Sequence, residues 1–434
     1  MSKVALATLG CKVNQCESAY LEEILSRNNF DIHPFTEEAD LFCINTCAVT
    51  SRAAMQSRQL IRRAARLNAE AKIVVMGCYP QVAPEEIAAI PGVTHILGTS
   101  EKLALLNYIS RREENAYPFI SLKDPRHAPD PNPLVFSAFS NRTRAFLKVQ
   151  DGCDAFCSYC IVPYARGRSR SIPLVSILEQ VKRFLDHGYL EIVLSGIHLG
   201  QWGSDLQPKQ ELIGLLLAIF GHHPPPRLRL SSLEPGEISS DLLALIASEP
   251  NLCPHLHIPL QSGDAIMLER MNRHYRPHFY SEIVLEALHR IPDLAVGVDV
   301  MVGFPGETDE RFLSTYRLLE SLPVAYLHIF PFSPRSGTPA AHMGEQLSAA
   351  LISQRCRVLR ELDKSKRLTF LNRFLGKVRP VLVENRQDAA TGLSCGFSDN
   401  YLPVLVQSDI PLENQNVLAR FNRVEEGKLV ATPI

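Results

Sequence analysis

The chain has 434 residues, 46% of them hydrophobic, which is enough apolar material for two or three packed domains. Its 45 basic and 46 acidic residues nearly cancel, so any contact with nucleic acid must come from a local basic patch. The longest apolar run, at 212–221, is about half of a membrane span, and the first residues lack the apolar core of a signal peptide. We therefore expect a cytoplasmic protein whose eleven cysteines are reduced and available to metals.

Residues 1–115 alternate short apolar runs with stretches of helical periodicity. The apolar runs read KVALATLG, ADLFCIN, KIVVMG and THILG. Such alternation is typical of βαβ units, so an α/β domain with a doubly wound parallel sheet is predicted. The following stretch contains DPRHAPDPNP, and its prolines predict a linker over 116–143.

A second series of strand and helix patterns covers residues 144–372. Its six strand candidates are AFLKVQ, LEIVLSG, RLRLSS, HLHIPL, VGVDVMVG and AYLHIFPF. Six units are too few for an eight-stranded barrel and predict an open, partial (βα)6 barrel. Residues 373–434 change to strands and turns, which predicts a small RNA-binding β-barrel with candidate contacts at 373–379 and 397–401.

Three cysteines follow the first strand of this second series, in DGCDAFCSYCIVPYARGRSR. Cys153, Cys157 and Cys160 form a C-x3-C-x2-C pattern at the strand end, where barrels of this kind hold their active sites. A structural zinc site would need a fourth ligand, and the next histidine and cysteine in the sequence are His187 and Cys253. The pattern therefore favours a metal centre with one open position, with a zinc knuckle or buried thiols as the alternative.

The first domain offers a second set of three thiols. Cys11, Cys47 and Cys78 each come just after a predicted parallel strand. Because the carboxyl ends of such strands meet at one edge of the sheet, these three side chains are expected to converge. The other five cysteines are expected to pack as small apolar side chains; they are Cys16, Cys43, Cys253, Cys356 and Cys395.

Taken together, these motifs resemble the methylthiotransferase family of radical S-adenosylmethionine (SAM) enzymes. The resemblance rests on the two cysteine triads, on SGIHLGQW, RLSSLEPGEI, HLHIPLQSGD and DVMVGFPGET, and on a last segment similar to the TRAM domain. Within the family, LGCKVNQCES and VPYARGRSRS are most similar to the branch that modifies N6-threonylcarbamoyladenosine beside the tRNA anticodon, at position 37.

The resemblance implies an enzyme with two 4Fe-4S clusters, one on each cysteine triad, and with SAM as both methyl donor and radical source. It implies methylthio transfer to C2 of the base, with the tRNA anticodon loop, an electron donor of flavodoxin or ferredoxin type and a sulfur source as partners, and no membrane. Methylthiolation of isopentenyladenosine or of a ribosomal-protein aspartyl residue stays open. A two-cluster electron carrier is the remaining alternative, although carriers normally close each cluster with four cysteines.

Further candidates lie at or just past predicted strand ends, where the adenosine and methionine parts of SAM are expected; these are Gly196, His198, Glu234, Gln261, Ser262 and Gly303. Ordinary turn chemistry explains them about as well. His257 is expected to be a satisfied core histidine, and no side chain is assigned as a catalytic acid or base. The arginines that leave the cluster loop are predicted to contact RNA, SAM or the carboxylate of the base; they are Arg166, Arg168 and Arg170.

Overall fold

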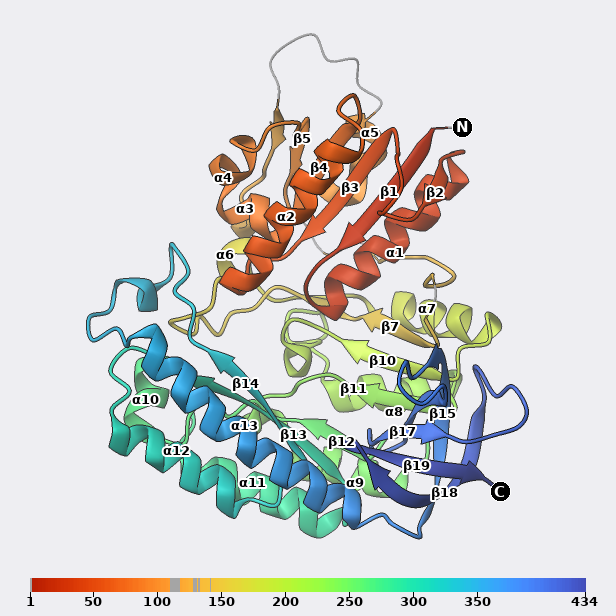
Figure 1. Cartoon of the computed structure of the whole chain (residues 1–434), viewed down its shortest axis with the longest axis vertical. Coiled ribbons are helices and arrows are strands. Elements are labelled where there is room, and N and C mark those ends of the chain that lie inside the picture. Colours follow the sequence, from red (N-terminus) through yellow and green to blue (C-terminus); the bar gives the residue numbers. More distant parts are fainter. Residues whose placement is uncertain (1, 110–117, 128–130, 132, 141) are drawn as a thin grey trace.

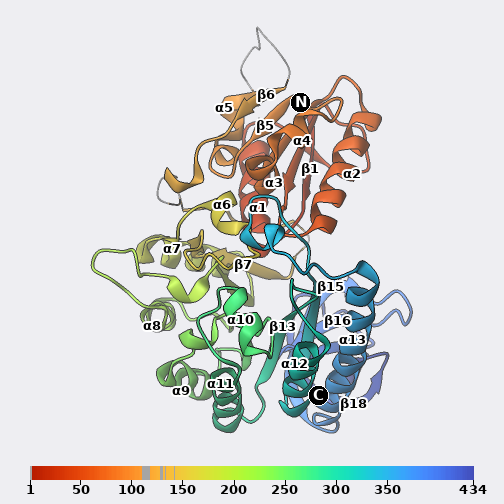
Figure 2. The ribbon, with the colours of Figure 1, turned by 90° about the vertical axis from the view of Figure 1, so that its left-hand side faces the viewer.

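A computed structural model describes residues 2–109, 118–127, 131, 133–140 and 142–434. The amino-terminal α/β domain stacks on a partial barrel, and a small β-barrel lies beside the lower end of that barrel (Figure 1). Seen from the side, the segment after the last barrel strand rises to the first domain (Figure 2). There the backbone N–H of Ser51 donates to Ser333 Oγ at 3.1 Å. No helix within the described ranges combines the length and apolarity that a bilayer span requires.

The first domain is a parallel sheet in the strand order β2-β1-β3-β4-β5-β6. All six residues of β3 are buried, as expected for a strand covered on both faces. The strands are β1 (Lys3–Thr8), β2 (Asp31–His33), β3 (Leu41–Thr46), β4 (Lys72–Gly77), β5 (His95–Leu97) and β6 (Phe119–Ser121). The helices are α1 (Lys12–Arg27), α2 (Ser51–Leu67), α3 (Cys78–Val82), α4 (Pro84–Ala88), η1 (Glu101–Ala104) and α5 (Leu105–Ile109).

This domain extends past the predicted boundary at residue 115. Strand β6 pairs in parallel with β5, so 119–121 belong to the sheet and not to a linker. The prolines of this stretch indicated a linker, although an apolar side chain within it packs in the core. Phe136 is buried, with its ring centroid 5.3 Å from that of Phe184 in the barrel. Residues 116–117, 128–130, 132 and 141 of the predicted linker lie outside the described residues.

The predicted partial barrel is confirmed. Its parallel strands follow the order β7-β10-β11 and β12-β13-β14, and a parallel bridge from Leu228 to Leu252 joins the two groups. The strands are β7 (Arg144–Lys148), β10 (Glu191–Ser195), β11 (Arg227–Leu230), β12 (His255–His257), β13 (Ala295–Val302) and β14 (Tyr326–Pro331), and a short ribbon adds β8 (Gln150–Asp151) and β9 (Arg170–Ser171).

Helices cover the outside of the barrel strands, as βα units require. The α-helices are α6 (Val162–Arg166), α7 (Leu174–Asp186), α8 (Leu212–His222), α9 (Ser240–Ser248), α10 (Ala265–Arg270), α11 (Pro277–Arg290), α12 (Asp309–Ser321) and α13 (Ala349–Asn372). Shorter 3-10 turns are η2 (Pro125–His127), η3 (Leu199–Gln201), η4 (Pro235–Glu237) and η5 (Pro339–His342).

The last segment is a closed β-barrel in the order β15-β16-β17-β19-β18, as predicted. Its strands are β15 (Val378–Gln387), β16 (Ser394–Ser398), β17 (Pro403–Val406), β18 (Asn416–Glu425) and β19 (Lys428–Pro433). Its core is not separate, because Tyr326 of β14 packs into it.

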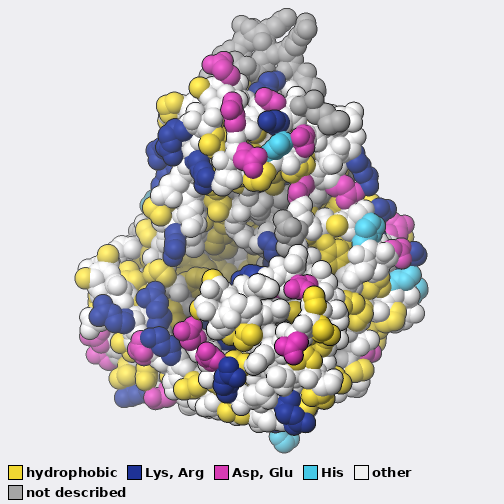
Figure 3. Space-filling model, turned by 45° about the vertical axis from the view of Figure 1, so that its right-hand side comes forward, with side chains coloured by type: hydrophobic (Ala, Val, Ile, Leu, Met, Phe, Trp, Pro, Cys, Tyr) yellow, Lys and Arg dark blue, Asp and Glu magenta, His cyan; other side chains and the backbone are white. Residues whose placement is uncertain are grey.

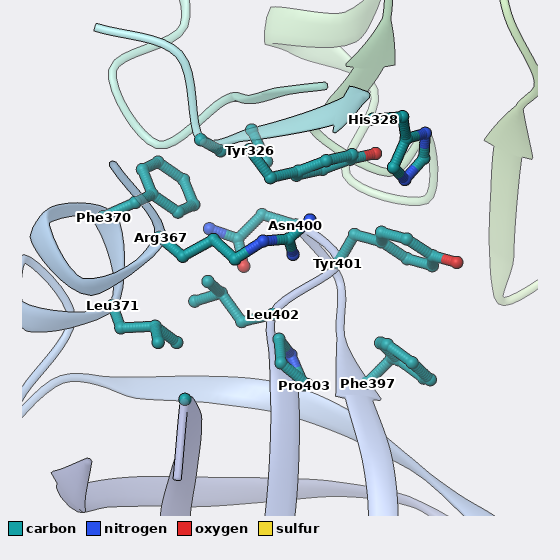
Figure 4. Close-up of a pocket in the computed structure, with 13 residues that line it drawn as sticks. Tyr326, His328, Arg367, Phe370, Leu371, Phe397, Asn400, Tyr401, Leu402 and Pro403 are labelled. Atoms are coloured by element: carbon teal, nitrogen blue, oxygen red, sulfur yellow. The ribbon is translucent and has the colours of Figure 1, made fainter. Parts of the chain in front are cut away.

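The loop between β16 and β17 closes the amino-terminal mouth of the partial barrel. Arg227 donates to the carbonyl oxygens of Phe397 and Ser398 at 3.1 and 2.8 Å, and Arg229 donates to that of Asp399 at 2.9 Å. The rings of Phe397 and Tyr401 stack with centroids 4.9 Å apart (Figure 4). Residues 397–401 therefore join the two barrels, and their predicted contact with RNA stays a prediction.

Candidate active site

The loop that carries Cys153, Cys157 and Cys160 is fixed by backbone contacts just past β8. The N–H of Cys153 donates to the Gly167 carbonyl at 3.0 Å, and that of Cys160 donates to the Cys157 carbonyl at 2.9 Å. Gly152 has φ +75°, and a Cβ there would lie 1.8 Å from the Arg168 carbonyl oxygen. Only glycine lets the chain turn at this point.

Gln150 holds this loop to the next strand. Its Nε2 donates to the carbonyls of Asp151 and Gly152 at 3.0 and 2.8 Å, while its Oε1 accepts from the N–H of His198 at 2.8 Å. The same Oε1 would lie 3.0 Å from a Cβ at Gly196. The predicted residues Gly196 and His198 therefore lie directly beside the cluster loop.

Two of these thiols touch polar side chains. Cys153 Sγ lies 3.5 Å from His198 Nδ1, and Cys157 Sγ accepts from Arg273 Nη1 at 3.4 Å. Burial lowers the pKa of His198, but contacts with Cys153 and Glu237 outweigh it and raise the pKa to about 10. These groups place positive charge against the sulfurs, which suits thiolates.

The second triad lies at the carboxyl edge of the first sheet. Cys11 caps α1 after β1, Cys47 follows β3, and Cys78 opens α3 after β4. Gly10 has φ +102°, and a Cβ there would lie 3.0 Å from Cys47 Sγ. The arrowheads of β1 and β3 point toward the barrel in Figure 1, so this edge faces the second domain.

Both triads suit a metal cluster better than free thiols. Burial raises the pKa of Cys47 and of Cys160 to about 12, so these thiols would keep their protons without a cation. A bound metal ion stabilises the thiolate outright. Three sulfur donors at each site leave one iron of a four-iron cluster open to another ligand.

The cysteines expected to pack as apolar side chains lie elsewhere. Cys43 is buried in the middle of β3, and Cys16 donates to the Phe146 carbonyl at 3.2 Å in the interface with β7. Cys253, Cys356 and Cys395 are also buried.

A buried charge network joins the two domains between the triads. Arg166 is 2% exposed and donates to Asp151 Oδ1 at 2.8 Å, Glu17 Oε1 at 3.1 Å and Asn14 Oδ1 at 2.5 Å. Lys102 and Lys148 pair with the same carboxylates. The prediction that Arg166 contacts RNA or SAM does not fit this position, because the buried guanidinium makes four hydrogen bonds to the first domain and the cluster loop.

The other two arginines of the run differ from each other. Arg170 Nη2 donates to the carbonyl of Arg166 at 2.8 Å, so it supports the loop. The Arg168 side chain is 73% exposed. Of the three arginines, Arg168 is the one placed to reach a partner on the surface.

The remaining candidates for SAM contact divide into two groups. Glu234 pairs with Arg273 beside Cys157, and the N–H of Gln261 donates to the Asp299 carbonyl at 2.9 Å with φ +64°. By contrast, the buried Ser262 hydroxyl lies 3.2 Å from Thr315 Oγ1, and a Cβ at Gly303 would lie 2.3 Å from Ile352. Ser262 and Gly303 therefore face α12 and α13.

Sequence reasoning missed Arg273 and Gln150. Arg273 contacts a cysteine 116 positions earlier in the chain, and nothing in its own neighbourhood marks it. Gln150 does sit two residues before the glycine of the cluster loop, so its position at the strand end was the available signal.

A space-filling view shows a hollow beneath the first domain, with hydrophobic side chains in its depth and lysines and arginines on its rim (Figure 3). Next to the second triad, a cavity of about 380 Å³ is lined by Ala48 and Tyr79, the neighbours of Cys47 and Cys78, and by Arg58 and Arg335. The thiols of the first domain thus lie beside space that a large substrate can enter.

Comparison with known proteins agrees with this geometry. A family model described as uncharacterized protein family UPF0004 matches residues 3–98, and the radical SAM superfamily model matches residues 147–319. The threonylcarbamoyladenosine tRNA methylthiotransferase MtaB of Bacillus subtilis is 37% identical over 93% of this chain and 90% of its own length. The chain belongs to the methylthiotransferase family. The MtaB of Aquifex aeolicus is 38% identical to this methylthiotransferase, over 88% of this chain and 94% of its own.

Another branch of the family is more distant from this methylthiotransferase. The tRNA-2-methylthio-N(6)-dimethylallyladenosine synthase of Fusobacterium nucleatum is 29% identical, over 99% of both chains. Among solved structures, the radical SAM methyltransferase TsrM of Kitasatospora setae has a TM-score of 0.58 and 17% identity over 79% of this chain and 77% of its own, which supports the fold. As a radical SAM enzyme, the methylthiotransferase uses SAM and a 4Fe-4S cluster.

Proposed function

We propose that this methylthiotransferase adds a methylthio group to C2 of N6-threonylcarbamoyladenosine at tRNA position 37. The observation that carries the proposal is that two triads of thiols, from separate domains, lie on either side of one interface that the Arg166 network holds together. One triad with an open metal position suffices to cleave SAM, whereas sulfur transfer also needs a place to hold sulfur. The printed names of the most similar relatives support the choice of base.

The proposed ligands are Cys153, Cys157 and Cys160 for the cluster that binds SAM, and Cys11, Cys47 and Cys78 for the second. When bound, the first cluster and SAM supply a 5′-deoxyadenosyl radical, and the chemistry belongs to these cofactors. The side chains of the protein orient the groups and exclude water. Gln150 fixes the cluster loop, and Arg273, paired with Glu234, keeps a positive charge at Cys157.

The partners of the reaction are also proposals. The radical step consumes an electron, so a donor of flavodoxin or ferredoxin type and a source of sulfur are required. Isopentenyladenosine and a ribosomal-protein aspartyl group are the competing substrates, and the lower identity to the dimethylallyladenosine branch favours the threonylcarbamoyl base.

The test offers the reconstituted enzyme three substrates in parallel with SAM, a reductant and sulfide. These are tRNA with threonylcarbamoyladenosine, tRNA with isopentenyladenosine, and the ribosomal-protein substrate. Mass spectrometry of digested products should find the methylthio group only on the first. A methylthio product from either of the others, with none on threonylcarbamoyladenosine, would contradict the proposal.

A further inference from the structure

Three polar side chains lie side by side on the inner face of the partial barrel. His257, Asp299 and His328 come from the adjacent strands β12, β13 and β14, and Asp299 and His328 are direct partners in the strand register. Asp299 Oδ1 lies 3.1 Å from His257 Nε2 and 3.2 Å from His328 Nδ1. One carboxylate oxygen therefore orients two imidazole rings.

The two histidines differ in what they leave free. His257 places Nδ1 2.6 Å from Ser232 Oγ, while its Nε2 has the 3.1 Å contact with Asp299 Oδ1 but no hydrogen bond of good geometry. The His328 side chain is 47% exposed, and within the described part of the chain no residue occupies its Nε2. The expectation of a satisfied histidine therefore holds for His257 at Nδ1 and is not met at Nε2.

A series of contacts links this group to the loop that carries Cys157. Ser232, which contacts His257, comes two residues before Glu234, and Glu234 pairs with Arg273 beside Cys157. Beneath the group, the hydroxyl of Tyr326 lies 2.8 Å from His255 Nε2. Figure 4 shows that hydroxyl directed toward the ring of His328, away from Phe370 and Leu371.

An exposed aromatic ring continues the same surface toward the cluster end. Phe330 lies two residues after His328 on β14, so both side chains are on one face of the strand. Their ring centroids are 6.3 Å apart, and Phe330 is 42% exposed. An exposed aromatic face beside a polar nitrogen suits a base with a polar arm, because bases stack on aromatic rings.

We propose that His328, held by Asp299, binds the carboxylate of the threonylcarbamoyl arm while Phe330 stacks on the base. The inference rests on the proposed function and names the residues that select its substrate. A carboxylate needs a hydrogen-bond donor, and Nε2 of the His328 imidazolium can supply one while Nδ1 donates to Asp299. Three other candidate donors are occupied: Arg166 by Glu17 and Asp151, Arg229 by Glu191, and Arg273 by Glu234.

Ionisation of Asp299 supports this role. Burial by itself would raise the Asp299 pKa, but hydrogen bonds from His257 and His328 lower it to about 2. The carboxylate is therefore charged at neutral pH and accepts from His328 Nδ1, so a second hydrogen bond donated by Nε2 requires the doubly protonated imidazolium ring. That contact fixes the ring orientation and aims Nε2 into the lumen.

The experiment compares two substrates that differ only in the charge of the arm. One is tRNA with threonylcarbamoyladenosine, and the other carries the threonyl amide in place of the carboxylate. For the unaltered enzyme, the amide should lower kcat/KM and raise the Kd for tRNA by about 10- to 100-fold, the usual range for one charge-assisted hydrogen bond. His328→Ala should bind and modify both with equal, low efficiency, and His328→Gln should recover part of the difference.

The controls separate this inference from the proposed function. His278→Ala, an 84% exposed histidine on α11, should behave as the unaltered enzyme does. Reductive cleavage of SAM without tRNA should be unchanged in His328→Ala, because His328 does not touch the cysteines. If the unaltered enzyme modifies neither tRNA, the proposed function is wrong. If it modifies the tRNA with threonylcarbamoyladenosine and His328→Ala keeps full discrimination, only the present inference is wrong.

Two further outcomes would overturn it. The same three side chains have the composition of a divalent-metal site, with ligand atoms within 4.8 Å of one another. Loss of one zinc or manganese ion per chain in His328→Ala, measured by elemental analysis, would assign them to a metal instead. Lys12, whose charge acts on the buried His255, is another cation that could bind the carboxylate of the arm. Loss of discrimination in Lys12→Ala alone would assign the carboxylate to Lys12.

Discussion

At the scale of single residues, Arg166 shows how a motif can mislead when its fold is unknown. In the sequence it belongs to a basic run beside a cluster loop, where binding of an anion is the natural interpretation. In the structure the anions are protein carboxylates, because Glu17 and Asp151 meet Arg166 in the domain interface. Glu17 lies 149 positions earlier, so no local pattern could have indicated the pairing.

Replacing Arg166 should destabilise the protein strongly. Arg166→Ala leaves Glu17 and Asp151 with fewer partners in a buried site, and removal of one member of such a network typically costs about 3–5 kcal/mol. Denaturant unfolding of the iron-loaded enzyme should show this loss. Arg168→Ala, an exposed neighbour in the same loop, should change the free energy of unfolding by less than about 0.5 kcal/mol. Equal stability of the two variants would contradict the assignment.

The same carboxylates predict the acid sensitivity of the fold. Burial favours their neutral forms, but nearby cations hold both pKa values well below the usual range: Arg166, Lys102 and Lys148 for Glu17, and Arg166, Lys148 and Arg170 for Asp151. A carboxyl whose pKa is lowered by folding stabilises the protein when the pH is above its unfolded-state pKa of about 4. This contribution is lost as the pH falls below that value. The free energy of unfolding should therefore drop between about pH 5 and pH 3, and less steeply in Glu17→Gln. An unchanged slope in that variant would exclude Glu17 as a cause.

At the scale of elements, the loop from Phe397 to Tyr401 makes the last domain part of the catalytic barrel. Its carbonyls accept from Arg227 and Arg229, and Asn400 Nδ2 donates to the Asp293 carbonyl at 3.0 Å. The guanidinium carbon of Arg144 lies 4.8 Å from the centre of the Phe397 ring. The small barrel therefore completes the barrel floor in addition to any contact with RNA.

Removal of residues 373–434 should consequently do more than weaken tRNA binding. Arg227, Arg229 and Glu191 would lose the loop that covers them, and Tyr326 would be exposed. We expect a lower melting temperature of the barrel domain and a slower reductive cleavage of SAM without tRNA. A point variant, Tyr401→Ala, should lower the free energy of unfolding by about 3 kcal/mol with the full chain present. A truncated chain that melts as the whole does would show that the loop is dispensable.

Most elements could be predicted from sequence because their signals are local. Alternating βα patterns, the six barrel strands and the change to an all-strand segment are set by periodicity and turn residues. Strand β6 was not predicted because its three residues, Phe119–Ser121, follow no clear period and border the proline-rich stretch. The placement of Cys11, Cys47 and Cys78 at one sheet edge could be predicted because the ends of parallel strands converge, and Cys153, Cys157 and Cys160 form a local motif in one loop. Arg273 and the loop at 397–401 depend on contacts between distant segments.

At the scale of the whole molecule, the fold holds two sulfur-rich sites in a fixed relation. The edge with Cys11, Cys47 and Cys78 faces the barrel, and the network around Arg166 lies between the domains. The hydrogen bond from Ser51 to Ser333 is a further contact between the first domain and the segment after β14. A rigid arrangement suits a reaction in which one site activates a carbon and the other delivers sulfur, because correct placement of two reactants replaces a bimolecular encounter.

The two triads should therefore be separable in function. Changing Cys153, Cys157 and Cys160 to alanine should abolish deoxyadenosine formation, since SAM loses its iron, and should leave about half of the iron bound. Changing Cys11, Cys47 and Cys78 should also leave about half of the iron, yet deoxyadenosine should still form while methylthio transfer stops. Iron analysis, spectroscopy of the reduced clusters and product chromatography measure the three quantities. Cys395→Ala, in the last barrel, should match the unaltered enzyme in all of them. A triple variant that keeps all its iron would disprove the ligand set for that site. Methylthio transfer in the variant without Cys11, Cys47 and Cys78 would disprove their role in holding sulfur.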